Sequence, residues 1–379
     1  MRTILKHSRL GALFVALLLC SCATKHSIRP QLPREVAMNP GAGRGQHLLV
    51  PLRLESGEEV LFMVDTGAEI TLLDNSLAPK LGEPLGQITV WRWGTKSESK
   101  LYAAPKLYLR GAPLKITGGG VADYDLKEAS SAYGRPVLGI LGIDCLENYC
   151  VQLDFAANRM RFLDSEHANK TDWGKAFPIT DSGDGRPVIR ENLAGVKDAC
   201  SLIDTGFNTD GWLATNVFQQ WTNQANPSAK GEVRCPTGVL GEETYPEMDL
   251  SEIGDSNGIG LSFLARHLVT FDFPNRTMYL KRTSEGPLKP ECFEAARGCL
   301  QNLLNKGRLP GWSKDSSGEF VTAQCDPSLT CFIIKMRKNG DISNYYYEVV
   351  QAGKRSRWKL QKAWRTDESN RTIEQYPVL

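Results

Sequence analysis

The sequence predicts a mainly β protein in which two repeated lobes, residues 46–165 and 166–283, precede a small α+β module at 288–379. A short apolar strand that ends in Asp-Thr-Gly occurs twice, and the segments downstream of the two copies match in register. Beyond Arg282 the composition changes to a linker that contains Ser, Gly and Pro, which separates the module from the lobes. The length of 379 residues is consistent with two or three domains.

The composition is that of a folded chain without a strong charge bias. Hydrophobic residues make up 41% of the chain and charged residues 23%, and the formal net charge is +2. So small a charge gives little electrostatic attraction to nucleic acid, and we expect no nucleic-acid partner. The cysteines form no Cys-x-x-Cys pair and the five histidines are scattered, so we expect no metal site.

The N-terminus predicts a targeting segment, because basic residues precede an apolar stretch at 10–19. Ser21 directly before Cys22, with Leu19 three residues before that cysteine, resembles a bacterial lipobox. This resemblance implies that residues 1–21 are a lipoprotein signal peptide and that Cys22 carries a lipid anchor to a membrane. An ordinary cleaved signal peptide is the alternative.

Residues 22–45 are polar and contain Pro and Gly, which predicts a tether. Ala23, rather than Asp, follows the proposed anchor. By resemblance to proteobacterial lipoproteins, this residue favours the periplasmic face of the outer membrane. The expected location is therefore the bacterial cell envelope.

Two carboxylates follow the repeated apolar strands. Residues 60–64 lead into Asp65, and residues 200–203 lead into Asp204. One Asp-Thr-Gly sequence also forms an ordinary turn, but a carboxylate at the end of a buried strand is costly unless it is hydrogen-bonded or used. The two together predict a dyad that shares one proton.

The repeat extends well beyond the two Asp-Thr-Gly sequences. The spacing from Gly142 to Asp154 equals the spacing from Gly260 to Asp272, and Phe follows each of these aspartates. A register match of this length indicates two homologous lobes within one chain.

Residues 65–73 resemble the active-site stretch of retropepsin-like aspartic proteases, and residues 140–144 resemble their second signature, whose glycine passes close behind the catalytic loop. The likeness covers about residues 46–283, and the lobes are shorter than those of pepsins. It implies two tandem aspartic-protease-like β lobes and an aspartic endopeptidase that hydrolyses peptide or protein substrates. Asp65 and Asp204 would hold and activate a water, without a cofactor.

The same resemblance assigns supporting roles to the residues that follow each catalytic Asp. The hydroxyls of Thr66 and Thr205 would each bond to the opposite lobe. Gly67 and Gly206 would allow tight turns and would offer backbone N–H groups to the carboxylates.

Lobe two departs from the family pattern at two places. Phe207 stands where a small residue or a hydroxyl is usual, and Gly258 stands where an apolar residue is usual. Phe207 favours an alternative in which the lobes are catalytically inactive and bind peptides or other envelope components, whereas the intact Asp in both lobes favours catalysis. Because Ala68 and Phe207 carry no hydroxyl, we also expect dyad pKa values above those of pepsin.

A third interpretation makes the C-terminal module the functional part and the lobes a scaffold.

Residues 88–96 alternate in polarity and then turn, which predicts a hairpin. By resemblance this hairpin occupies the place of the flap that closes on bound peptide, with Trp91, Trp93 and Gly94 as candidate flap residues. The alternative is that both tryptophans pack against lobe one.

The C-terminal module shows a helical apolar pattern at 293–304, followed by strand patterns at 331–336, 345–350 and 358–364. Its clustered aromatic residues could form a binding face, but core packing is the expected use. These residues are Tyr345, Tyr346, Tyr347, Trp358 and Trp364. A turn signal between Cys325 and Cys331 would also let these two cysteines face each other and form a disulfide. The oligomeric state stays open.

Overall fold

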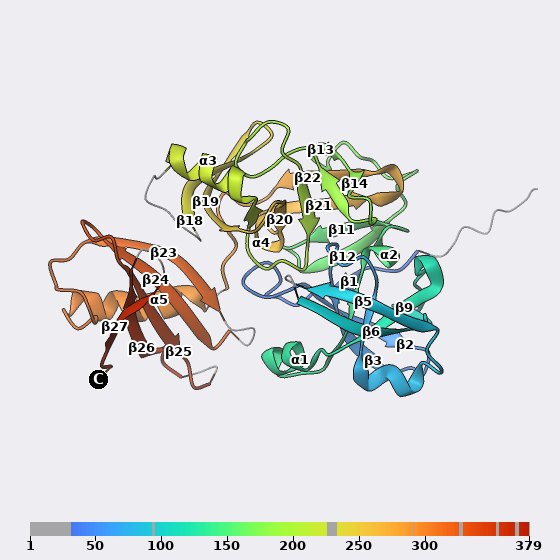
Figure 1. Cartoon of the computed structure of the whole chain (residues 1–379), viewed down its shortest axis with the longest axis horizontal. Helices are drawn as coiled ribbons and strands as arrows, with labels where there is room; N and C mark the ends of the chain where they lie inside the picture. Colours follow the sequence, from blue (N-terminus) through green and yellow to red (C-terminus); the bar gives the residue numbers. More distant parts are fainter. Residues whose placement is uncertain are drawn as a thin grey trace, which may run out of the picture. The chain divides into compact units, whose positions relative to one another are not determined.

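The computed structural model describes residues 32–92, 95–225, 233–290, 292–325, 329–353, 356–367 and 371–378. Strands account for 43% of the chain and helices for 15%, which confirms the predicted mainly β class. Four sheets and a few short helices make up the described part of the chain (Figure 1). No helix within it is both long and apolar enough to cross a membrane.

Lobe one is built on a nine-stranded sheet. In spatial order its strands are β5 (Gly86–Arg92), β6 (Thr95–Ala103), β9 (Gly120–Tyr124), β4 (Leu72–Asp74), β10 (Val137–Leu141), β3 (Glu59–Val64), β2 (Leu49–Leu54), β7 (Leu107–Leu109) and β8 (Ala112–Pro113). The apolar run of β3 is buried because β2 and β10 flank it on both sides. This central position explains why β3 reads as a continuous apolar stretch rather than an alternating one.

Lobe two is built on a seven-stranded sheet with a related plan. Its strands in order are β14 (Thr180–Asp181), β15 (Pro187–Ile189), β16 (Ser201–Asp204), β20 (Asn257–Gly260), β17 (Gly211–Leu213), β19 (Glu243–Glu252) and β18 (Val233–Leu240). The core order β4-β10-β3 of lobe one corresponds to β17-β20-β16 here, with a parallel and an antiparallel pair in each. The sequence repeat is thus also a structural repeat.

A six-stranded sheet joins the two lobes. Its order is β1 (Val36–Ala37), β12 (Arg159–Leu163), β11 (Cys150–Asp154), β21 (His267–Asp272), β22 (Thr277–Arg282) and β13 (Lys175–Pro178). Strands β11 and β21 pair antiparallel in its middle, one from each lobe, and Figure 1 shows them side by side. One hydrophobic core cluster accordingly continues through both lobes.

The expected tether at 22–45 is wrong for its last part. Val36 and Met38 are buried, and β1 extends the shared sheet by pairing with β12. Ala42 is also buried, and Asn39 Oδ1 accepts a hydrogen bond from the N–H of Leu49 at 2.8 Å. The apolar side chains in this stretch therefore bind it to the body of the lobes. Residues 22–31, with Cys22, lie outside the described residues.

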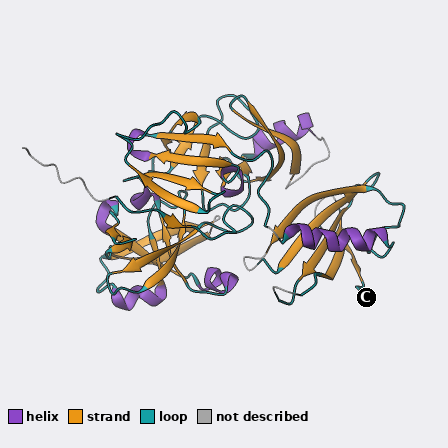
Figure 2. Cartoon of the chain, turned by 180° about the vertical axis from the view of Figure 1, so that it is seen from behind, coloured by secondary structure: helices purple, strands orange, loops and turns teal. Residues whose placement is uncertain are grey.

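The C-terminal module has one helix on one face of a five-stranded antiparallel sheet (Figure 2). The strands follow chain order: β23 (Gly318–Cys325), β24 (Cys331–Lys338), β25 (Asn344–Val350), β26 (Lys359–Thr366) and β27 (Thr372–Tyr376). The sequence predicted only the middle three of these strands. The side chain of Cys325 lies outside the described part, so the disulfide to Cys331 stays a prediction.

The aromatic side chains of the module divide between the two faces of this sheet. Tyr345 and Tyr347 are buried in the core beneath the helix, and Trp358 packs against that core. Tyr346 and Trp364 alternate to the other face, where their rings stack at 5.4 Å between centroids. Core packing is therefore right for three of the five and wrong for these two.

The helices are short. The α-helices are α1 (Lys127–Tyr133), α2 (Ile143–Leu146), α3 (Thr215–Ala225), α4 (Leu261–Leu264) and α5 (Phe293–Asn305), and the 3₁₀ helices are η1 (Asn75–Lys80), η2 (Thr117–Gly119) and η3 (Phe273–Asn275). Helices α2 and α4 are a further equivalent pair, because each directly follows a glycine: Gly142 comes just after β10, and Gly260 is the last residue of β20.

Candidate active site

The two aspartates lie at the carboxyl ends of equivalent central strands. Asp65 directly follows β3, and its N–H donates to the carbonyl of Leu141 at 3.0 Å. Asp204 ends β16 and pairs in parallel register with Gly260. Each Asp is therefore placed by a strand that neighbouring strands hold on both sides.

A glycine passes directly behind each Asp-Thr-Gly loop. A Cβ added to Gly142 would lie 2.7 Å from the carbonyl carbon of Ile70, and one added to Gly260 would lie 2.4 Å from the carbonyl oxygen of Thr209. No real Cβ is tolerated so close to backbone atoms, so each position requires glycine. This is the close approach that the second signature predicts for lobe one, and lobe two repeats it.

Two threonines lock the loops of the two lobes to each other. The N–H of Thr66 donates to Thr205 Oγ1 at 3.0 Å, and the N–H of Thr205 donates to Thr66 Oγ1 at 3.1 Å. Thr66 Oγ1 in turn donates to the carbonyl of Ile203 at 2.7 Å, and Thr205 Oγ1 donates to that of Val64 at 2.9 Å. Both threonines are buried, so these four hydrogen bonds satisfy backbone groups that water does not reach.

The glycines of the two motifs bring the carboxyl groups together. The N–H of Gly67 donates to Asp65 Oδ1, and that of Gly206 donates to Asp204 Oδ1, each at 2.8 Å. A Cβ on Gly67 would lie 2.5 Å from the carboxyl carbon of Asp204, and one on Gly206 would lie 2.4 Å from that of Asp65. Only glycine leaves room for the opposite carboxyl group, so each carboxyl group lies against the motif glycine of the other lobe, and the two carboxyl groups are close enough to shift each other's pKa.

Burial raises the pKa of both carboxyl groups, although each residue keeps part of its surface exposed. The pKa of Asp204 lies well above its ordinary value, because burial and then the negative charge of Asp65 both disfavour its ionised form. The hydrogen bond from Asp204 and the N–H groups of Gly67 and Ala68 partly offset the burial of Asp65. A pair of this kind holds one proton between two carboxyl groups over a range of pH. It can act on a water as base and acid together.

Phe207 does not lie between the carboxyl groups. Its ring packs edge-on against Trp212, with 4.7 Å between centroids, and Trp212 sits across from Gly258 in the sheet. A Cβ on Gly258 would lie 2.2 Å from the Trp212 ring. The corresponding pair in lobe one is Leu72 opposite Ile140. The two departures of lobe two therefore compensate each other: a glycine makes room for an indole, and the indole supports Phe207.

The predicted flap hairpin is formed by β5 and β6, which pair continuously from Gly86–Leu101 to Arg92–Thr95. Trp91 is 64% exposed, and the ammonium of Lys96 lies 4.3 Å from its ring centroid, so this tryptophan does not pack into lobe one. Trp93 and Gly94 lie outside the described residues.

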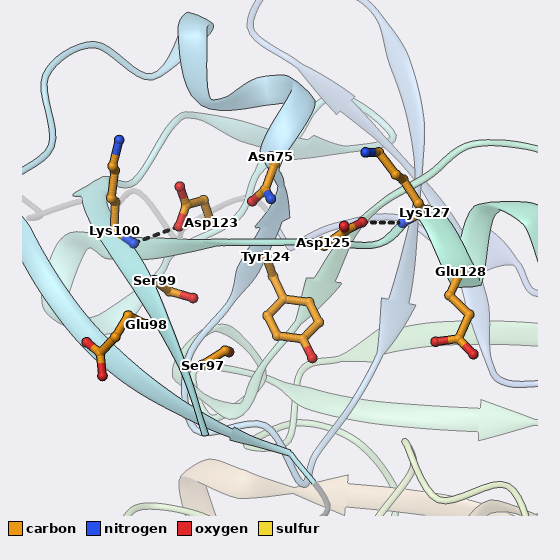
Figure 3. Close-up of a pocket in the computed structure, with 10 residues that line it drawn as sticks. All are labelled: Asn75, Ser97, Glu98, Ser99, Lys100, Asp123, Tyr124, Asp125, Lys127 and Glu128. Carbon is orange, nitrogen blue, oxygen red and sulfur yellow. Dashed lines mark hydrogen bonds between the residues drawn. The ribbon is translucent and has the colours of Figure 1, made fainter. Parts of the chain in front are cut away.

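A cavity of about 620 Å³ lies in lobe one, where β6 and β9 meet the start of α1 (Figure 3). Its polar lining is held by backbone-to-carboxylate hydrogen bonds, from Lys100 to Asp123 and from Lys127 to Asp125. The other lining residues are Asn75, Ser97, Glu98, Ser99, Tyr124 and Glu128. None of its lining residues belongs to the dyad or its supporting loops, so this cavity is not the candidate active site.

Sequence reasoning gave no role to a charged group beside the dyad. The positive charge of Arg186 partly offsets the burial that raises the pKa of Asp65. The pKa of Arg186 is itself raised, first by its hydrogen bond to Asp184 and in smaller part by the negative charge of Asp204. Arg186 comes from the loop before β15, far from the motif in sequence, and only the lobe repeat could have indicated its position.

Among the described residues Asp164, Glu166 and His167 also cluster closely enough to consider a metal, but they are largely exposed and His167 Nδ1 bonds to Asp164.

Comparisons with known proteins add a distant likeness. No family model and no curated protein matches the chain. A solved structure, basic 7S globulin from soybean, is similar at a TM-score of 0.46 and 11% identity, over 67% of this chain and 96% of that one. At this TM-score the likeness carries no functional argument, and the site rests on its own geometry.

Proposed function

We propose that this protein is an aspartic-type endopeptidase of the retropepsin-like kind, with Asp65 and Asp204 as its catalytic dyad. One observation carries the proposal: two carboxyl groups, one from each lobe, meet between loops locked by the Thr66 and Thr205 bonds, each against the motif glycine of the opposite lobe. A buried pair of acids costs stability. A scaffold that serves only to bind peptides would have no physical need for it.

The chemistry follows from the shared proton. With one proton on the pair, the ionised carboxylate accepts a proton from a bound water as that water attacks the scissile carbonyl carbon. The protonated partner donates to the carbonyl oxygen, and the resulting gem-diol collapses as the leaving amine is protonated. Every proton moves between water, substrate and the two carboxyl groups, so the proposed reaction needs no cofactor or covalent intermediate.

The test replaces each carboxyl group separately. Asp65→Asn and Asp204→Asn should each abolish cleavage of a mixed peptide library read by mass spectrometry, because the dyad acts as a unit. Asp125→Asn, an exposed Asp in the same lobe as Asp65, is the matched control and should leave cleavage unchanged. Near-normal turnover by Asp204→Asn would remove lobe two from the active site. Peptide binding without any cleavage by the wild type would favour the non-catalytic alternative.

The proposed pH window lies above that of pepsin. Burial raises the pKa of both carboxyl groups, and neither Ala68 nor Phe207 offers a hydroxyl to stabilise the ionised form. The singly protonated pair should therefore persist to higher pH, with a bell-shaped kcat/KM profile. Ala68→Ser should shift this profile toward acid. An optimum in strong acid for the wild type, or no acid shift in Ala68→Ser, would show that these two side chains do not set the protonation of the dyad.

We also propose that Cys22 is lipidated and holds the protein at the periplasmic face of a bacterial outer membrane. The support is the lipobox-like sequence that ends at Cys22. Mass spectrometry of the mature N-terminus should find a lipid-modified Cys22, and Cys22→Ser should lack the modification. An unmodified terminus at another residue in the wild type would refute the anchor.

A further inference from the structure

The two lobes contact each other at a second equivalent pair of positions, beside the dyad. Asp184 stands 20 residues before Asp204, and Gly45 stands 20 residues before Asp65. The fourth residue after each catalytic Asp meets one of these loops of the opposite lobe. Asn208 Nδ2 donates to the carbonyl of Gly45 at 2.7 Å. The equivalent contact on the other side brings Glu69 next to Asp184 and Arg186.

These equivalent contacts differ in charge. The Asn208 contact is neutral, whereas Glu69, Asp184 and Arg186 form a charged cluster. Arg186 directs its guanidinium to Asp184, which accepts from Nε at 2.9 Å and from Nη2 at 2.5 Å. With two carboxylates and one guanidinium, the cluster carries one net negative charge when all three groups are ionised. Burial and then the charge of Asp184 raise the pKa of Glu69, and the charge of Arg186 partly offsets this.

Glu69 is the accessible member of this cluster. Its side chain is 58% exposed, compared with 32% for Arg186 and 28% for Asp184. Its carboxylate lies 4.0 Å from Arg186 Nε, which is beyond hydrogen-bond distance. Glu69 is four residues from Asp65, and Arg186 is close enough to the dyad to act on its charges. An accessible negative group thus stands at one side of the dyad, with an amide at the equivalent place on the other side.

We propose that Glu69 makes this a substrate-orienting site, which selects peptides with a Lys or Arg side chain on one side of the scissile bond. This inference rests on the proposed endopeptidase function. The two halves of the site already differ in shape at Ala68 and Phe207. A carboxylate in one half and an amide in the other adds a difference in charge, because only one direction of an extended peptide brings a cationic side chain to Glu69.

The size of the effect is modest because Glu69 is exposed. An exposed ion pair changes binding by about two- to fivefold. Glu69 therefore acts as a preference for one residue class at one position, and the chemistry at the dyad is left intact. A purely structural role, as a bridge between lobes, would instead change stability and overall rate without changing which residue is preferred.

The experiment profiles cleavage sites in a peptide library for the wild type, Glu69→Gln and Glu69→Arg. The wild type should enrich Lys and Arg at one position relative to the cleaved bond. Glu69→Gln should lose this enrichment, and Glu69→Arg should replace it with Asp and Glu. Glu58→Gln, an exposed Glu of lobe one in the β2–β3 turn, is the control and should keep the wild-type profile. Unchanged enrichment in both Glu69 variants, or cleavage by the wild type without any enrichment of Lys and Arg, would overturn the proposal.

A binding assay separates this proposal from the proposed reaction. Fluorescence anisotropy with Asp204→Asn can compare hexapeptides that differ only by Lys or Gln at one position, with and without Glu69→Gln in the same chain. Tighter binding of the Lys peptide that disappears with Glu69→Gln supports the orienting site even if the wild type cleaves nothing. Equal affinities, or no peptide binding at all, refute it even if the wild type proves to be a protease. Equal melting temperatures of the variants exclude misfolding as the cause.

Discussion

Replacing Thr205 with Val should cost far more stability than its small chemical change suggests. The two side chains have nearly the same shape, but Val has no hydroxyl. The substitution removes the acceptor of the Thr66 N–H bond, at 3.0 Å, and the donor to the Val64 carbonyl, at 2.9 Å. Because Thr66 and Thr205 are both buried, no water can replace these bonds without opening the contact between the lobes.

The magnitude follows from the two backbone groups left unpaired. Each buried unpaired group costs about 1–3 kcal/mol, so Thr205→Val should destabilise the lobe contact by about 2–6 kcal/mol. Thr205→Ser keeps the hydroxyl and loses one buried methyl group, which costs about 1 kcal/mol. Thr66→Val removes the mirrored bonds to Thr205 and Ile203 and should cost about as much as Thr205→Val.

Peptide-resolved hydrogen exchange on segments 60–72 and 200–213 is the suitable assay. The module has its own hydrophobic core, so a global unfolding curve could contain more than one transition. Protection of both segments should fall together in either Val variant and persist in Thr205→Ser. A Thr205→Val variant as protected as Thr205→Ser, or a loss confined to one lobe, would refute the reciprocal lock.

Three further predictions concern lobe two and the dyad. Gly258→Ala should lower the melting temperature, at a cost of about 1–3 kcal/mol, because its Cβ would lie 2.2 Å from the Trp212 ring. Adding Trp212→Leu should relieve the clash, and an unchanged melting temperature for Gly258→Ala alone would contradict this prediction. Arg186→Gln should raise the pKa of Asp65 and move the kcat/KM profile to higher pH, and a shift toward acid would refute the assigned role. The pKa of Asp204 is raised above the ordinary 3.8, so the folded state binds more protons than the unfolded state, and wild-type stability falls as pH rises through the folded pKa. In denaturant titrations at several pH values, Asp204→Asn should escape this loss of stability. Parallel pH dependences of the wild type and the variant would contradict the prediction.

The sequence predicted the centre of the fold because several local signals agree there. The apolar strands before Asp65 and Asp204 and the matched spacing after Gly142 and Gly260 all require the same arrangement. The structure places these four residues where the repeat predicts them. The outermost strands of the module, β23 and β27, lacked such agreement. The side chains of β27 are mostly exposed, so its sequence carries little hydrophobic pattern.

What the sequence did not show at the site has a different origin. The packing of Phe207 was not predicted because its partner Trp212 lies on another strand, and pairing across a sheet is not visible in the local sequence. Arg186 was overlooked for the same reason, since it reaches the dyad from a loop that precedes β15. Tyr346 and Trp364 were assigned to a core, although alternation along a strand sends them to the face opposite Tyr345.

The two lobes agree in sequence where a residue must fit the opposite lobe and differ where it fits only its own. The Asp, Thr and Gly of each motif contact their counterparts across the lobe contact, and both motifs keep the same residue types there. Phe207 packs within lobe two, and its equivalent Ala68 is free to differ. Glu69 and Asn208 break this rule, because each meets the opposite lobe and yet their chemistry differs. Their partners differ as well, since Asn208 meets the backbone carbonyl of Gly45 and Glu69 meets the Asp184–Arg186 pair, so each side chain fits its own neighbours. Under the proposed endopeptidase function, this difference in charge is what would let the site distinguish the two directions of an extended peptide.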